Sequence, residues 1–184
     1  VGLATFDEDI IEYVPPSAKH LRLVLHALER TAHGAQPDAA PGAPLRASTL
    51  DAPLRKLTES LRRRSIVLLI SDLYEEPDAV LSALANVRGR GNDLIVFHLL
   101  DRSELEFPFA DATNFVDIET GDRMPVIPDY LRAQYRQVVA EHTATLGRRM
   151  REQRIDYALF DTSKPLDQAL FTYLLARERF STAR

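Results

Sequence analysis

The sequence contains no cysteine, which excludes disulfides, thiolate zinc sites and cysteine nucleophiles and fits a reducing compartment. It also lacks any apolar run near the roughly 20 residues that a membrane helix needs, and no signal peptide is visible. The formal net charge of −4 gives no basic surface of the kind that nucleic acids require. These absences predict a soluble, cytoplasmic chain without a nucleic-acid partner.

The bulk composition is that of one globular domain. Hydrophobic residues make up 45% and charged residues 27% of the 184 positions, which is ordinary for a folded protein with its own core. We therefore expect a single domain over residues 1–184. Because the chain opens on Val1 directly in a strand-like pattern, we also expect it to be a fragment of a longer protein.

Buried strands alternate with helices along most of the chain. Three continuous apolar runs, typical of strands covered on both faces, span Ser65–Ile70, Asp93–Leu100 and Ile155–Phe160. Helical spacing of apolar residues lies between and around them, at about 21–30, 50–61, 78–87, 128–153 and 166–177. This alternation predicts an α/β fold with an open, mostly parallel sheet and flanking helices.

Two β-hairpins and one loop complete the predicted organisation. Val1–Phe6 and Ile10–Val14 form an N-terminal hairpin, and a second hairpin is inserted between Asp101 and Pro128, with Glu119–Asp122 as its turn. The segment 32–46 is rich in proline, glycine and alanine, so we expect a mobile loop.

Acidic residues follow each of the three buried strands, namely Asp72, Asp101 and Asp161, with Ser71, Thr162 and Ser163 beside them. Ligands bind beyond the carboxyl ends of strands in such sheets, and clustered carboxylates and hydroxyls suit Mg²⁺. The alternative is that these residues cap the following helices. Capping is the favoured interpretation for Asp161, because Pro165 begins a helix, whereas both interpretations stay open for Ser71 and Asp72.

The other chemistry-bearing residues do not form a recognisable active site. The histidines show no metal-binding spacing, and His98, inside a buried strand, is interpreted as a hydrogen-bonded core residue. The sequence has no phosphate-binding glycine loop, no Gly-x-Ser-x-Gly elbow and no Ser/His/Asp set. We therefore expect a protein that is not an enzyme.

Several segments taken together resemble the bacterial domain-of-unknown-function family 58, whose members contain a von Willebrand factor A-like domain. The segments that carry the resemblance are Val1–Asp7, Tyr13–Pro16, Arg62–Leu73, Glu119–Gly121 and Phe160–Thr162. Its most specific part is Arg63–Asp72. It covers essentially the whole chain and implies a von Willebrand A-like, Rossmann-like fold.

The resemblance also implies a metal-ion-dependent adhesion site, which holds Mg²⁺ or another divalent cation at the sheet edge. Asp72 matches one ligand, and a threonine ligand falls at Ser48 or Thr49, which are also candidate N-caps of the helix that follows. The Asp-x-Ser-x-Ser motif of the family is absent, so the site is incomplete. In the family's sheet, the strand that carries this motif lies between the strand at Val1 and the strand at Ser65–Ile70. Three alternatives follow from its absence. The two strands close on each other, a second copy fills the gap in a homodimer, or the fragment is part of a larger fold.

The resemblance implies a protein-interaction module that works with a MoxR-type AAA+ ATPase in assembly or chaperone-like roles. Two alternatives remain. One is a metal-dependent hydrolase that uses Asp72, Asp101 and Asp161 together, and the other is a purely structural part of a larger protein. Some family members carry an upstream membrane anchor, so the resemblance allows for such an anchor in the parent protein.

Overall fold

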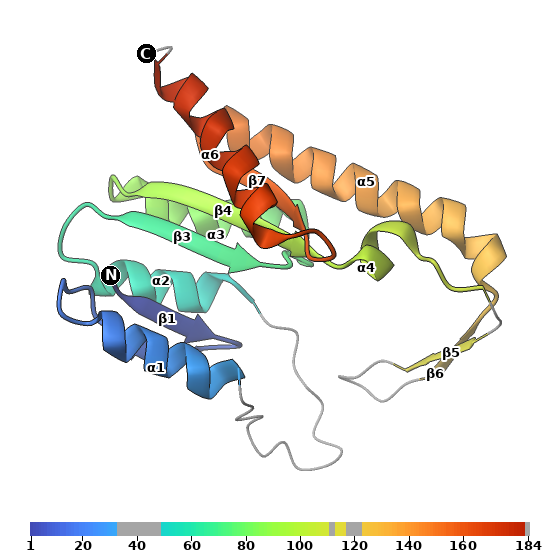
Figure 1. Ribbon diagram of the computed structural model, residues 1–184, viewed down its shortest axis with the longest axis horizontal. Helices are drawn as coiled ribbons and strands as arrows, with labels where there is room; N and C mark the ends of the chain where they lie inside the picture. The colour runs from blue at the N-terminus through green and yellow to red at the C-terminus, as the bar shows by residue number, and fades with distance from the viewer. Residues whose placement is uncertain (33–48, 111–112, 117–122, 183–184) are drawn as a thin grey trace.

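Strands and helices alternate along the chain in the computed structural model (Figure 1), which describes residues 1–32, 49–110, 113–116 and 123–182. The elements in chain order are β1 (Leu3–Phe6), β2 (Ile10–Val14), α1 (Leu21–Ala32), α2 (Asp51–Ser60), β3 (Ile66–Ser71), α3 (Pro77–Gly89), β4 (Asp93–Leu100), α4 (Arg102–Glu106), β5 (Thr113–Val116), β6 (Arg123–Val126), α5 (Pro128–Glu152), β7 (Asp156–Asp161) and α6 (Leu166–Thr182).

The central sheet is parallel and three-stranded, with the order β3-β4-β7. Ser71 pairs with His98 in one ladder, and Leu100 pairs with Asp161 in the other, so all three strands end at one edge. Helices α2, α3 and α5 contribute to the core on one face, and α6 covers the other (Figure 1). The predicted open α/β fold with flanking helices is confirmed.

Strand β4 lies at the centre of the packing. Val96 is fully buried in the main core, which also contains Leu84 of α3 and Leu146 of α5. On the opposite face, the ring of Phe97 lies 4.5 Å from that of Phe160 and 4.9 Å from that of Tyr173 in α6. The apolar run of β4 is therefore covered on both sides, as predicted.

Strand β3 differs from its prediction. Val67 and Leu69 are buried, but Ile66, Leu68 and Ile70 are 66%, 46% and 53% exposed. The cluster beneath α6 draws its strand residues from β4 and β7 and none from β3. The expectation that β3 is covered on both faces is therefore wrong, because α6 does not extend across the whole sheet.

The N-terminal hairpin forms as predicted, with β1 and β2 antiparallel. Val14, together with Val24 and Ala27 of α1, makes a small core of its own. Among the described residues no strand pairing joins β1 to β3, so direct closure of these two strands, one of the three alternatives, is contradicted.

The inserted hairpin also forms, with β5 antiparallel to β6 and Thr113 opposite Val126. Its predicted turn, Glu119–Asp122, and the predicted loop from residue 33 onward lie outside the described residues. The short helix α4 was not predicted. None of the described helices combines the length and apolar character needed to cross a membrane.

The core assignment is testable by a Leu84→Ala substitution. Leu84 is fully buried, and such truncations cost about 2–5 kcal/mol in the free energy of unfolding. Leu174→Ala on α6 is the matched control, since Leu174 is 58% exposed and surface changes usually stay within about 0.5 kcal/mol. Urea unfolding measures both, and equal losses would contradict the assignment.

Candidate functional site at the carboxyl edge of the sheet

The turn after β3 is held from three directions. Leu73 has a φ of 50°, in the left-handed region that costs a non-glycine residue about 1–3 kcal/mol. Its side chain is only 1% exposed, and its N–H donates to Ser71 Oγ at 3.2 Å. His142 Nε2 of α5 lies 2.8 Å from the Leu73 carbonyl oxygen and donates to it. These contacts fix the backbone on which Asp72 stands.

Asp72 itself is exposed at the tip of this turn. The Ser71 hydroxyl donates to Asp72 Oδ1 over a long 3.4 Å while it accepts from the Leu73 N–H. One hydroxyl can fill both roles, since it has one donor and two acceptor positions. The turn therefore presents a carboxylate to solvent on a rigid support at the carboxyl edge of the sheet.

The segment before α2 lies beside the loop that follows Asp72. The N–H of Leu50 donates to Glu75 Oε1 at 2.7 Å, and Leu50 is buried in the same core cluster as Leu73. Thr49 is thereby held near this loop, and its side chain is exposed. Leu50 is the N-cap of α2 and no side chain caps the helix, so the capping role expected of Thr49 is wrong. Ser48 lies outside the described residues.

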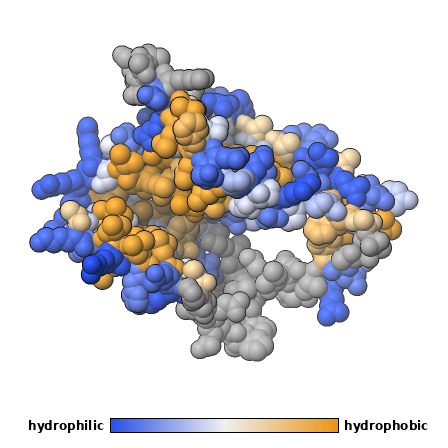
Figure 2. Space-filling view, in the orientation of Figure 1, coloured by the Kyte–Doolittle hydropathy of each residue, from blue (hydrophilic) through white to orange (hydrophobic). Residues whose placement is uncertain are grey.

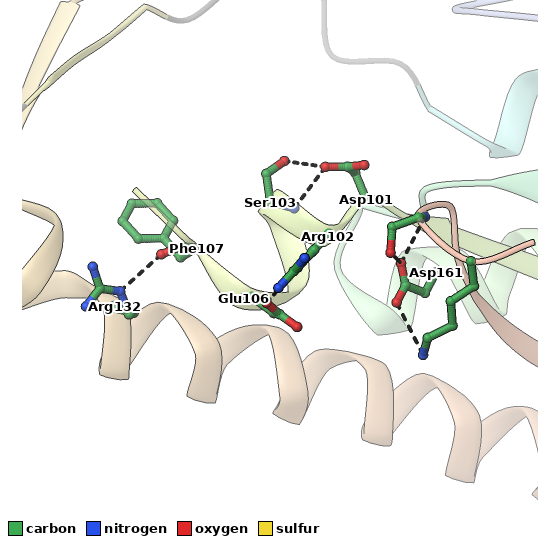
Figure 3. Close-up of polar contacts among 9 residues, drawn as sticks. Asp101, Arg102, Ser103, Glu106, Phe107, Arg132 and Asp161 are labelled. Carbon is green, nitrogen blue, oxygen red and sulfur yellow. Dashed lines mark hydrogen bonds and ion pairs between the residues drawn. The ribbon is translucent and has the colours of Figure 1, made fainter. Parts of the chain in front are cut away.

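Asp101 has a capping role (Figure 3). It is the N-cap of α4, where its Oδ1 accepts from the Ser103 N–H at 2.8 Å and from the Ser103 hydroxyl at 2.6 Å. Its own N–H donates to Glu104 at 2.6 Å, which completes a capping box. The hydrogen bonds from Ser103 hold the pKa of Asp101 down at about 2.

Asp161 is engaged in the same way (Figure 3). Its Oδ1 accepts from the Ser163 hydroxyl at 2.6 Å and from the Ser163 N–H at 3.0 Å. Lys164 Nζ lies 3.3 Å from Oδ2. The Ser163 hydroxyl is the main cause of the lowered pKa of Asp161. Asp161 therefore holds the turn before α6, but α6 begins only at Leu166, so the expectation that Asp161 caps this helix is wrong.

The three acids share an edge but do not form one cluster. Thr162 Oγ1 donates to Asp101 Oδ2 at 3.2 Å, which links the loops after β4 and β7. Within the part of the chain that the structure describes, no group of three or more histidine, aspartate or glutamate side chains is placed to hold a metal ion. These three carboxylates therefore do not converge on one point, as a metal-dependent hydrolase that used Asp72, Asp101 and Asp161 together would require.

A buried histidine lies under the same edge. His98 is fully buried and pairs in register with Ser71. Its Nδ1 lies 2.8 Å from the Tyr157 hydroxyl, which confirms the expected hydrogen-bonded core histidine. Burial lowers the pKa of His98. Gly147 of α5 makes room for this pair, since a Cβ there would lie 3.1 Å from the Tyr157 ring.

Two residues that position the turn were missed by the sequence analysis, namely His142 and Glu75. A signal for His142 was present, because it lies four residues before the buried Leu146 and therefore on the buried face of α5. Glu75 has no comparable signal, since its partner is a main-chain N–H that is 25 residues away.

These features define an α/β domain with an open parallel sheet and a rigid, acid-bearing turn at its carboxyl edge. A family model described as "Protein of unknown function DUF58" matches residues 1–145. The chain belongs to this family. No curated protein and no solved structure matches it.

The support of the turn is testable through His142→Ala. The substitution leaves the Leu73 carbonyl without its donor, which costs about 1–3 kcal/mol for a buried group, and hydrogen exchange in residues 71–75 should quicken. His26→Ala is the control, because His26 is exposed on α1. Unchanged exchange in 71–75 would contradict this role.

The buried His98 predicts a pH dependence of stability. Its pKa is lower in the folded chain, so between that value and about 6.5 only the unfolded chain binds the proton. Stability is therefore complete above about pH 6.5 and is lost as the pH falls below it, by up to about 1.4 kcal/mol per pH unit. His98→Gln should flatten this slope in urea unfolding from pH 7 to 5. An equal dependence of stability on pH in the wild type and in His98→Gln would contradict the assignment of this effect to His98.

Proposed function

We propose that this chain is a non-enzymatic protein-interaction module of von Willebrand A-like type, which works with a MoxR-type AAA+ ATPase in the cytoplasm, in an assembly or chaperone-like role. The single observation that carries the proposal is the turn after β3. Asp72 is exposed there, while Leu73 is fixed by burial and by His142. A rigid, solvent-facing carboxylate at this edge suits recognition of a partner surface.

The proposed site uses a divalent cation as part of its recognition surface. Asp72 would supply one oxygen ligand, and the hydroxyl of Thr49 or Ser48 a second, with the Leu50–Glu75 hydrogen bond holding Thr49 near the Asp72 loop. Both are oxygen ligands of the kind that Mg²⁺ prefers. The bound ion would supply a positive centre for an acidic group of the partner.

The fit to a cation is partial within these 184 residues. No Asp-x-Ser-x-Ser motif is present in the sequence. The carboxylates of Asp101 and Asp161 already accept hydrogen bonds from the serine that follows each of them two residues later. A site of two ligands leaves most of the coordination sphere of Mg²⁺ to water, so weak binding is expected. Tight binding requires ligands from outside this chain.

The proposal is tested with Asp72→Ala in the longest natural form of the polypeptide. Association with a MoxR-type ATPase, measured by sedimentation in Mg²⁺ and again in EDTA, should weaken at least tenfold, or by about 1.4 kcal/mol, when either Asp72 or the cation is removed. Asp93→Ala is the matched control, since Asp93 is an exposed acid at the opposite edge of the sheet. Equal binding by the wild type and Asp72→Ala, or binding that is indifferent to EDTA, would overturn the proposal.

A further inference from the structure

The amino edge of the central sheet, where β3, β4 and β7 begin, lies opposite the turn that carries Asp72. Three connections meet there, namely residues 61–65 before β3, 90–92 before β4 and 153–155 before β7. Figure 2 shows hydrophilic side chains projecting from the end of the molecule (left) at which β3 and β4 begin in Figure 1. These connections and the last turn of α5 carry exposed arginines, which we call the arginine edge: Arg62, Arg63, Arg64, Arg90, Arg151 and Arg154.

The first two connections are tied together by a buried polar side chain. The N–H of Ser65 donates to Asn92 Oδ1 at 2.9 Å, and Asn92 Nδ2 donates to the Val87 carbonyl oxygen at 2.9 Å. Asn92 is only 5% exposed. The Arg64 side chain lies across Gly91, where its Nε would be 3.0 Å from an added Cβ. The arginines before β3 and β4 therefore stand side by side on a fixed support.

The third connection lies two strands away from the first. Asp156, the first residue of β7, pairs with Ile95 of β4, and β4 also pairs with β3. Because neighbouring strands lie about 4.8 Å apart, β3 and β7 are separated by about 10 Å. The turn before β7 is closed by the Arg154 N–H, which donates to the Arg151 carbonyl oxygen at 2.9 Å. The arginine edge is therefore one continuous surface.

The arginines of this edge have no acidic partner. Among the described residues, no carboxylate lies within ion-pair distance of any of the six. Two nearby acids are engaged by other arginines, since Glu152 pairs with Arg148 at 3.3 Å and Asp156 pairs with Arg177 at 3.4 Å. Residues 59–65, 88–93 and 151–156 contain two further acids, Glu59 and Asp93. Positive charge therefore predominates at this edge, although the net charge of the chain is −4.

Helix stability explains part of this charge. Arg151 lies in the last turn of α5 and Arg90 is the C-cap of α3, where a cation interacts favourably with the helix dipole. Arg63 and Arg64 lie beyond α2 and its C-cap. Arg154 has a φ of 56°, a conformation that favours glycine over arginine. Helix stability therefore does not account for these last three arginines, and a partner with negative charge does.

The surroundings of the edge indicate which kind of anion it fits. Residues 61–65, 88–92 and 151–156 contain no aromatic residue on which a nucleic-acid base could stack. Their large apolar residues, Leu61 and Ile155, are half-buried and buried, so no side chain is available to enter a bilayer. Acidic residues predominate elsewhere in the chain, which disfavours a polyanion larger than the edge. A guanidinium group pairs with a carboxylate through two parallel hydrogen bonds.

We infer that the arginine edge binds a short acidic segment of a partner polypeptide. The aspartate and glutamate carboxylates of that segment pair with guanidinium groups from at least two of the three connections. The surface lies at the opposite end of the strands from Asp72 and uses no cation. Its failure in the experiment below would leave the proposed role of Asp72 untouched.

The experiment uses the 184-residue chain and a fluorescein-labelled ten-residue peptide in which glutamate alternates with serine, which places the carboxylates of an extended peptide on one face. Fluorescence anisotropy at 0.15 M salt should show binding, and replacement of the glutamates by glutamine should abolish it. Arg63→Glu/Arg154→Glu should weaken binding at least tenfold. The matched control is Arg123→Glu/Arg136→Glu, which changes the net charge equally at exposed positions of β6 and α5 and should stay within twofold of the wild type.

A second variant separates loss of charge from loss of structure. Arg154→Gly removes one guanidinium group and places glycine in the left-handed conformation that favours it. Thermal unfolding should therefore show a midpoint equal to or above that of the wild type, while peptide binding weakens at least threefold. Wild-type peptide affinity in this variant would contradict a role for Arg154 in binding.

Four outcomes would overturn the inference. One is the absence of binding to the glutamate peptide, and another is equal weakening by the two double variants, which would show a dependence on net charge alone. The third is tighter binding of a ten-nucleotide oligothymidine or of phosphatidylserine vesicles that Arg63→Glu/Arg154→Glu abolishes, since the partner would then be a nucleic acid or a membrane. The fourth is a dimer in sedimentation that the same variant dissolves, since a second copy would then cover the edge.

Discussion

A strand that is apolar on both of its faces is stable in a folded protein only if both faces are covered. Strand β4, from Leu94 to Leu100, is such a strand apart from His98. Helices α3 and α5 cover one face and α6 covers the other. Because β3 and β7 lie parallel to β4 on either side of it, the loops that follow all three strands lie at one edge of the sheet. The acidic turns, the buried His98 and the helix that carries His142 are all arranged around this strand.

The fold was predictable wherever an apolar segment is buried by other parts of the same chain. The run at β4 and the helices α3 and α5 were predicted correctly. Strand β3 is not covered on both faces, and neither is β7, where Leu159 is 43% exposed. A continuous apolar run does not distinguish a strand covered by its own chain from one whose second face is left open. Helix α4 was missed because its five residues carry no periodicity, although Asp101 followed three residues later by Glu104 is a legible capping box.

The site was predictable in position but not in chemistry. Asp101 and Asp161 are each followed two residues later by a serine, and in both cases that serine's hydroxyl and N–H occupy the carboxylate. Asp72 has Tyr74 at the same offset, and its carboxylate instead accepts a long 3.4 Å hydrogen bond from the Ser71 hydroxyl. This difference was legible in the sequence. The left-handed conformation of Leu73 was not, because no glycine marks it and the contact that stabilises it comes from α5.

The separation between the two halves of the chain also bears on cooperativity. The hairpin and α1 share a core of Val14, Val24 and Ala27, which is distinct from the core beneath β3 and β4. Phe6 packs against the main core, and an exposed ion pair joins Lys56 to Asp9, so the connection between the halves is slight. Such weak coupling should allow the two halves to unfold as separate units of unequal stability. Any contact that bridged the two halves would couple them, and the whole domain would then unfold in a single transition.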